Sequence, residues 1–358
     1  MKKIFFAAIT LIFALDGFAQ NHGAHTQNSV DTMPEKHLKN LKQLTFGGDN
    51  AEAYWSFDNS SLVFQSNYKK WGVQCDQIFT APIAKLGDSS YRPKMVSTGL
   101  GRTTCSYFMP DNKHMLYAST HLGGKDCPPN PETSGAYLWP IYSDFDIFVT
   151  NPKGEIVKQL THEPGYDAEA TVSPDGRSIV FTSTRSGDLE LWIMDIDGSN
   201  PRQITFGLGY DGGAFFSPDS KQLVFRASRP STPEEITQYK DLLAKNLVAP
   251  TNMEIYTVNV DGTDLKQITK LGKANWAPFF HPSGKKIIFS SNHHSKRGYD
   301  FQLYMIDIQS GNMERITNAS IFNAFPMFSP DGKKLVFSSN RNNGGTRDTN
   351  LFIADWVD

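Results

Sequence analysis

The chain has 358 residues, with 35 basic and 37 acidic side chains that leave a formal net charge of -2. This balance argues against the strongly basic surface that binding to nucleic acid requires, so no nucleic-acid partner is expected. Three cysteines are too few to hold together a small disulfide scaffold, and the core must therefore come from burial of apolar side chains. The 28 glycines, 20 prolines and many aromatic residues favour strands and tight turns over helices.

Residues 1–19 have the pattern of a signal peptide. Two lysines precede an apolar run at residues 4–15 that is too short to cross a bilayer, and small residues follow up to Ala19. We therefore expect cleavage after Ala19 and a protein of the periplasm or the extracellular space, with no lipid or transmembrane anchor. Residues 20–40 show no apolar period and are expected to form a flexible leader.

From residue 41 onward the sequence repeats a unit of four short strands. In each unit a strand enters a Pro-Asp-Gly type of turn, and three further strands follow, as in SIVFTS, ELWIMDI and RQIT. Insertions of variable length separate the units, which is typical of propeller blades. The sequence therefore predicts an all-β, six-bladed β-propeller of four-stranded antiparallel blades over residues 41–358. The six copies align through their turn residues, which are Asp58, Asp111, Asp175, Asp219, Ser283 and Asp331.

The fourth-strand pattern also occurs before the first blade, as LKQLTF at residues 41–46. The sixth unit has only three strands before the sequence ends at Asp358. We expect this N-terminal strand to complete the last blade, because it would close the ring and remove an exposed sheet edge.

The repeats resemble those of the TolB-type six-bladed propellers, whose units carry FSPDGKKLVFSSNR followed by LYxMDxDG. The first motif stands unchanged at residues 328–341, and LWIMDIDG at residues 191–198 matches the second. The resemblance covers residues 41–358 and implies the fold. It does not imply one function, because propellers with such repeats serve as binding platforms, as gating domains of peptidases and, with seven blades, as sugar lyases.

Strand alternation assigns the connections of the blades to two faces of the propeller. The short Pro-Asp-Gly and Asp-Gly turns lie on one face, which we call face two. The opposite face, face one, carries long and individual insertions, and binding residues usually lie on such loops. The insertions on face one are residues 121–143, 230–252, 293–300 and 342–348.

Two of these insertions contain recognisable features. The blade 4 insertion predicts a helix, because Thr232 and Glu235 form a capping box and an apolar stripe that includes Tyr239 and Leu247 continues up to Pro250. This helix could be a simple cover, a lid or a docking element. The blade 2 insertion is rich in proline and aromatic residues, and its Trp139 could stack on a sugar or a peptide or only pack within the loop.

Alignment of the units places two rings of polar side chains at the mouth of the channel on face one. Basic residues follow the second strand and acids or amides open the first strand, so most of them are expected to pair structurally with a neighbouring blade. His121 and His293 replace arginine in this pattern and are candidates for metal binding or proton transfer. The ring residues proposed as ligand contacts are His121, Asp167, Arg185, Asp211, Arg229, Asn275 and His293.

The third residue of each first strand is expected to line the channel wall. In this column, Glu52 and Glu169 interrupt a ring that is otherwise small or apolar. Two carboxylates at a channel mouth could bind a cation, act as acid and base, or simply accept structural hydrogen bonds. Together with Trp139 and the polar rings, they define the predicted site.

The three cysteines all fall near face one in blades 1 and 2, and one disulfide is expected. Cys105 with Cys127 is the preferred pair, and Cys75 with Cys105 is the next. If the thiols were reduced, the three cysteines and His121 could instead form a metal site.

The sequence contains no Gly-x-Ser-x-Gly elbow, no His-Glu-x-x-His motif, no phosphate-binding loop and no Cys-x-x-Cys pair. The favoured function is therefore an exported, monomeric binding or scaffold module for a protein, a peptide or a glycan, with no cofactor predicted but a divalent metal possible. The alternative is a propeller enzyme, a lyase or hydrolase of sugars or peptides, with a metal or acid/base site at the channel mouth.

Overall fold

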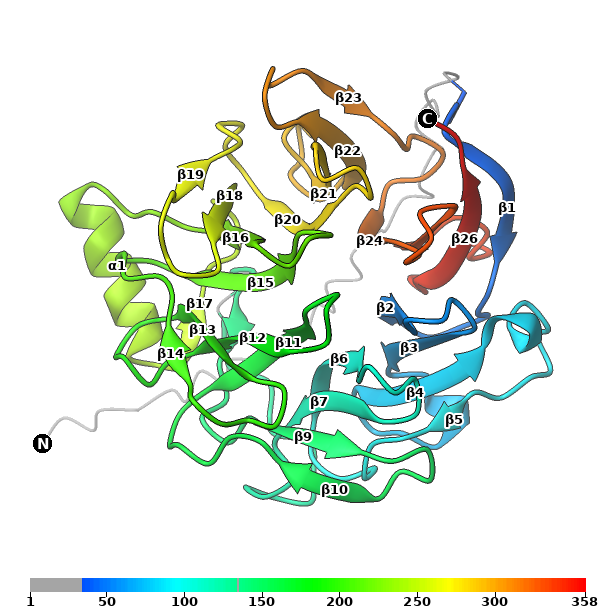
Figure 1. The fold of residues 1–358 in the computed structure, drawn as a ribbon, viewed down its shortest axis with the longest axis horizontal. Helices are drawn as coiled ribbons and strands as arrows, with labels where there is room; N and C mark the ends of the chain where they lie inside the picture. Colours follow the sequence, from blue (N-terminus) through cyan, green and yellow to red (C-terminus); the bar gives the residue numbers. More distant parts are fainter. Residues whose placement is uncertain (1–33, 134) are drawn as a thin grey trace, which may run out of the picture.

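A computed structural model of the chain describes residues 34–133 and 135–358. Six four-stranded antiparallel sheets surround a central axis, and the first strand of each sheet lies innermost (Figure 1). The predicted six-bladed propeller is thus confirmed. The predicted signal peptide and residues 20–33 of the predicted leader lie outside the described residues.

The first three blades follow one another along the chain. Blade 1 contains β2 (Asn50–Trp55), β3 (Ser61–Ser66), β4 (Gln77–Pro82) and β5 (Lys94–Met95). Blade 2 contains β6 (Thr103–Phe108), β7 (Met115–Ser119), β9 (Asp146–Thr150) and β10 (Ile156–Gln159). Blade 3 contains β11 (Asp167–Val172), β12 (Ser178–Ser183), β13 (Glu190–Asp195) and β14 (Arg202–Gln203).

The other three blades complete the ring. Blade 4 contains β15 (Asp211–Phe216), β16 (Gln222–Ala227), β18 (Glu254–Asn259) and β19 (Lys266–Gln267). Blade 5 contains β20 (Asn275–Phe280), β21 (Lys286–Ser291), β22 (Gln302–Asp307) and β23 (Met313–Arg315). Blade 6 contains β24 (Asn323–Phe328), β25 (Lys334–Ser339), β26 (Asn350–Trp356) and β1 (Leu38–Gln43). Outside the blades lie α1 (Pro233–Leu243), η1 (Lys69–Trp71), η2 (Ile83–Lys85), β8 (Trp139–Pro140) and β17 (Leu247–Val248).

The repeated sequence produces a repeated core. The central aromatic residue of each second strand is fully buried, so every blade contributes a large side chain to the packing. These residues are Phe64, Tyr117, Phe181, Phe225, Phe289 and Phe337.

The predicted closure of the ring is confirmed, with a shift in position. β1 pairs antiparallel with β26, and it begins at Leu38, three residues earlier than the sequence pattern suggested. The threonine that follows the fourth strand makes the same contact in blade 6 as in other blades. In blade 6 this residue is Thr45, whose Oγ1 accepts a hydrogen bond of 2.9 Å from the Leu351 amide of the third strand. In blades 2 and 5, Thr161 and Thr317 accept the corresponding bonds from Ile147 at 2.9 Å and Leu303 at 2.8 Å. The end of the predicted leader therefore belongs to the propeller.

The turns of face two are tied to each other around the ring. In three of the Ser-Pro-Asp turns the serine hydroxyl donates to the aspartate at 2.6–2.7 Å, as Ser329 does to Asp331. The Asp331 amide also donates to Asn59 of the next blade, at 3.2 Å, and thereby joins blade 6 to blade 1. These contacts agree with the predicted role of face two as a scaffold.

Candidate functional site

The inner strands all carry the same backbone distortion, and it directs one side chain per blade to the axis. Each inner strand has a bulge, and its third residue lies in the left-handed region with φ between 47° and 60°. This conformation is uncommon for residues other than glycine, and here it recurs in every blade. The six residues are Glu52, Cys105, Glu169, Gly213, Ala277 and Phe325, and all of them border one central cavity.

This cavity has a volume of about 440 Å³, within the range of binding pockets for small ligands. Its wall is rich in aromatic residues, with Tyr54, Trp139, Tyr166, Tyr210, Phe215, Trp276 and Phe325 among them. The predicted channel wall thus surrounds an enclosed, largely apolar space on the propeller axis.

The insertions of blades 2 and 4 meet over the cavity and cover it. β8 pairs antiparallel with β17, so that Trp139 lies opposite Val248, and the Ile141 amide donates to the Asn246 carbonyl at 2.8 Å. Trp139 and Val248 both border the cavity. The cover is therefore held by backbone hydrogen bonds between two insertions that are far apart in the sequence.

The helix of the blade 4 insertion is shorter than predicted. The capping box is present, because Thr232 accepts from the Glu235 amide and Glu235 bonds back to the Thr232 amide. The helix ends at Leu243, however, whereas the apolar pattern suggested a continuation up to Pro250. Leu247 leaves the helix because it takes part in the β17–β8 pairing.

A disulfide ties the cover to blade 1, but it is not the predicted one. Cys75 is bonded to Cys127, with their Cα atoms 6.1 Å apart, and Cys105 is a free thiol. The predicted Cys105–Cys127 pair is wrong because Cys105 occupies the inward position of β6 and faces the cavity. The insertion instead leaves blade 2 towards blade 1, where the Gly101 amide donates to the Lys125 carbonyl at 2.9 Å.

Replacing both Cys75 and Cys127 by serine is expected to lower the free energy of unfolding by about 2–4 kcal/mol, because the disulfide closes a loop of 52 residues. Urea denaturation measures this loss. The Cys105→Ser variant keeps the disulfide and is the control. A similar loss in both variants would contradict the assignment, as would non-reducing peptide mapping that joins Cys105 to either partner.

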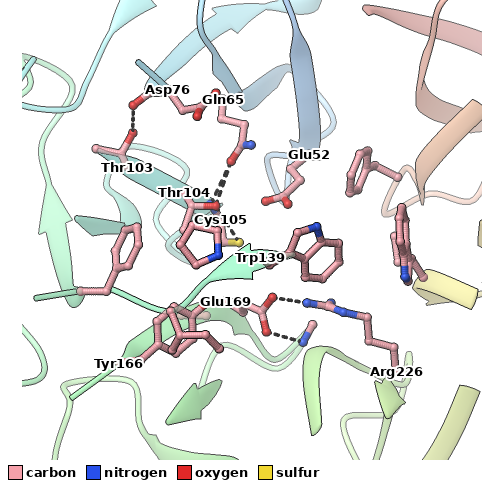
Figure 2. A pocket seen from close by; sticks show the side chains of 18 of the residues that line it. Glu52, Gln65, Asp76, Thr103, Thr104, Cys105, Trp139, Tyr166, Glu169 and Arg226 are labelled. Carbon is pink, nitrogen blue, oxygen red and sulfur yellow. Dashed lines mark hydrogen bonds and ion pairs between the residues drawn. The ribbon is translucent and has the colours of Figure 1, made fainter. Parts of the chain in front are cut away.

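Glu169 and Arg226 form a buried ion pair in the cavity wall (Figure 2). Glu169 also accepts hydrogen bonds from the Thr182 hydroxyl at 2.8 Å, the Tyr210 hydroxyl at 2.8 Å and the Gly213 amide at 2.9 Å. Burial disfavours the charge of Arg226, but Glu169, Tyr210 and Tyr166 together outweigh this effect and raise the pKa of the guanidinium. Glu169 is therefore committed to the structure of the wall.

Arg226 occupies space that a side chain at position 213 would need. A Cβ atom at Gly213 would lie 1.7 Å from Nη1 of Arg226. The guanidinium is also stacked on Trp139 and Tyr210, at 5.1 Å from each ring centroid. The wall thus combines a charged pair with two aromatic faces that already hold a cation.

Glu52 differs from Glu169 because one of its oxygens is uncommitted. Its Oε2 is buried and has no hydrogen-bond partner among the described residues. Burial raises the pKa of Glu52 to about 7, while a hydrogen bond with the Cys105 thiol acts in the opposite direction. Figure 2 shows the Glu52 carboxyl pointing into the space that Trp139, Glu169 and Arg226 also border. Among the described residues of the wall, the buried side-chain atoms without a partner are this oxygen and the Nε atoms of Arg102 and Arg226, and Oε2 of Glu52 is the acceptor among them.

The structure does not bring the predicted polar rings into this cavity. Arg185 pairs with Asp167 at 2.6 Å and Arg229 pairs with Asp211, in each case within one blade and not between neighbouring blades as expected. Asn275 accepts a hydrogen bond of 2.6 Å from the Ser291 hydroxyl. None of these five side chains borders the central cavity in the part of the chain that the structure describes.

The two ring histidines take the structural place of arginine. His121 is hydrogen-bonded to Ser119 at 2.9 Å and lies 4.5 Å from the Phe148 ring centroid. His293 makes the same pair of contacts, with Ser291 at 2.8 Å and Tyr304 at 4.5 Å. Arg185 likewise bonds to the serine two residues before it, at 2.9 Å, and stacks on an aromatic ring. Burial lowers the pKa of both histidines, which favours their neutral form.

Arg226 and much of the aromatic wall are not among the residues predicted from the sequence. A signal for Arg226 is present in the repeats, because the residue directly after the buried aromatic side chain of the second strand is small in most blades. This column reads Gln65, Ala118, Thr182, Arg226, Ser290 and Ser338. The residue pairs across the sheet with the second residue of the inner strand, beside the distorted position. A large charged residue at this position of one repeat therefore indicates a side chain that reaches the cavity.

No group of three or more histidine, cysteine, aspartate or glutamate side chains within residues 34–133 and 135–358 is arranged to hold a metal ion. Over the same residues, no helix combines the length and the apolar character needed to cross a bilayer.

The fold and the covered axial cavity define a six-bladed propeller with a candidate ligand site on face one. A family model described as the TolB beta propeller domain matches residues 142–242 and 239–351, which together exceed half of the chain. The chain therefore belongs to the TolB beta-propeller family.

Solved structures agree with this fold. The structure of putative TolB from Agrobacterium tumefaciens aligns with a TM-score of 0.56 at 20% identity, over 87% of this chain and 91% of that one. TolB from Acinetobacter baumannii aligns with a TM-score of 0.52 at 19% identity, over 87% of this chain and 64% of that one. A search of curated proteins found no significant match.

Proposed function

We propose that this protein is an exported binding protein whose ligand inserts a group into the covered cavity on face one. The observation that supports this function best is the cavity itself, which joins a largely apolar wall rich in aromatic residues to one uncommitted carboxyl group, that of Glu52. Aromatic walls with few polar groups are typical of binding sites. The periplasmic or extracellular location follows from the signal-peptide pattern at residues 1–19.

The composition of the wall favours binding over catalysis. Glu169 is tied to Arg226 and three hydrogen-bond donors, which leaves it unsuited to proton transfer. Burial raises the pKa of the Cys105 thiol well above its ordinary value, so a nucleophilic thiolate is disfavoured. Of the three carboxyl groups of the wall, Asp76 pairs with Arg102 and Glu169 with Arg226, so Glu52 is the one left without an ion pair.

Replacing Trp139 by alanine is expected to weaken the binding of cavity ligands at least tenfold, about 1.4 kcal/mol, because it removes one aromatic wall and part of the cover. We would measure thermal shifts and tryptophan fluorescence with defined peptides, oligosaccharides and small aromatic compounds. Phe206→Ala is the control, since Phe206 is 76% exposed and lies outside the cavity.

Equal binding by the wild-type protein and Trp139→Ala would place the ligand elsewhere and overturn the proposal. Conversion of a bound probe into product, lost in Glu52→Gln, would favour the enzymatic alternative.

A further inference from the structure

The charges around the cavity do not balance. Five charged side chains border it among the described residues, and four of them form two ion pairs. Arg102 pairs with Asp76 at 2.9 Å, and Arg226 pairs with Glu169. Glu52 is the fifth, so an ionised Glu52 leaves the cavity with one uncompensated negative charge.

The two tryptophan side chains of the wall use their N–H groups within the protein. The Trp139 indole donates to the Tyr137 hydroxyl at 3.1 Å, and the Trp276 indole donates to the Pro250 carbonyl at 2.8 Å. The two indole rings lie 5.1 Å apart between centroids. Arg226 stacks on Trp139, and Phe301 stacks on Trp276. Because both N–H groups are engaged, a ligand would contact the parts of the two rings that these neighbours leave uncovered, and aromatic faces attract cations.

Several other polar groups of the wall are engaged within the protein, whereas the Nε atoms of Arg102 and Arg226 have no partner among the described residues. Oε1 of Gln65 accepts from the Thr104 hydroxyl at 3.1 Å and from the Cys105 amide at 3.3 Å. The Thr103 hydroxyl donates to the Asp76 carbonyl at 3.0 Å. The buried acceptor of the described wall that lacks a partner is Oε2 of Glu52, and a ligand that donates to it would satisfy this atom.

We propose that the cavity binds an organic cation, a protonated amine on an apolar stem, whose charge pairs with Glu52 and whose stem packs on Trp139 and Trp276. The inference rests on the proposed function and names the ligand class of the same site. A cation would supply both the missing counter-charge and the missing hydrogen-bond donor for Oε2 of Glu52. A neutral ligand would leave the carboxylate without a counter-charge in a desolvated site.

The ionisation of Glu52 links binding to pH. Its pKa is raised to about 7 by burial, and the groups that act on it are Cys105, Glu169, Arg226 and Asp76. Above about pH 7 the carboxylate is available to a cation, and below it the proton occupies the site. Cation affinity is therefore expected to fall about tenfold between about pH 8 and pH 6.

The test uses two matched pairs of probes that differ in charge. The first pair is 2-phenylethylamine with 2-phenylethanol, and the second is N-acetyl-lysine amide with N-acetyl-norleucine amide. Both amines stay charged over this pH range. The first pair represents a free amine and the second a lysine side chain of a peptide. Calorimetry on the full exported chain would give each affinity at the two pH values.

We expect at least one amine to bind ten times more tightly than its neutral partner at about pH 8. Glu52→Gln should abolish this preference and the pH dependence, whereas Glu163→Gln, at an exposed site, should change neither. Melting curves would show that both variants fold.

Equal or tighter binding of the neutral probes overturns the inference. The proposed function would then stand if Trp139→Ala weakened the binding of those neutral probes. Failure of all four probes to bind the wild-type protein overturns the inference as well. In that case the proposed function depends on whether the peptides and oligosaccharides bind in a Trp139-dependent way.

Discussion

A chain that begins at residue 48 is expected to lose cooperative folding, whereas a chain that begins at residue 34 keeps it. The shorter chain lacks β1, whose pairing with β26 supplies the outer strand of blade 6. Leu38 and Leu44 are buried, and the loss of each such side chain costs about 1.5–3 kcal/mol. The exposed edge of β26 would in addition favour aggregation.

The residues just before β1 strengthen this closure. Glu35 binds the Arg341 guanidinium with both carboxylate oxygens, at 3.0 and 3.1 Å, and it accepts hydrogen bonds from the Asn318 and Ala319 amides. His37 stacks on Trp356 with ring centroids 4.9 Å apart. Because these contacts cross from the first described residues to the last blade, the loss on truncation approaches the whole stability of a typical domain, about 5–15 kcal/mol.

Thermal melting of the two truncated chains measures the effect. The chain that starts at residue 34 is the control, since it retains Glu35 and β1. Equal midpoints for both chains would contradict the closure by β1. An intermediate chain that starts at residue 39 should melt between them, because it loses Glu35, His37 and Leu38 but keeps most of the strand.

Arg226→Met is expected to lower the free energy of unfolding by about 3–5 kcal/mol, because it leaves the Glu169 carboxylate buried without its counter-charge. Three hydrogen bonds would still reach Glu169, and they limit the loss. The double variant with Glu169→Gln removes both charges and should recover a large part of the stability. Urea denaturation of the single and double variants gives the coupling between the two residues.

Two results would contradict this account. If the two substitutions were additive, Glu169 and Arg226 would not act as a pair. If Arg226→Met lowered the free energy of unfolding by less than Arg202→Met does at an exposed site, the ion pair would not stabilise the cavity wall. Arg202 is a suitable control because it lies in the outer strand β14 with an exposed side chain.

The bulge of the inner strands explains why only part of the site could be predicted. Simple alternation puts the first and third residues of a strand on the same side, so Asp167 and Glu169 were both expected at the channel mouth. The left-handed third residue interrupts this alternation, with φ of 57° at Glu169. As a result, Glu169 borders the cavity while Asp167 pairs with Arg185 outside it.

The sequence by itself determined the blades, the closure of the ring, the channel-wall column and the start of α1. Each of these depends on a local pattern or on the repetition of a pattern, and such patterns are read directly from neighbouring residues. Only the tertiary structure decided that β8 pairs with β17, that Cys75 and not Cys105 bonds to Cys127, and that Arg226 reaches Glu169. These contacts join insertions and blades that are distant in sequence, and their geometry depends on where the whole ring places each segment.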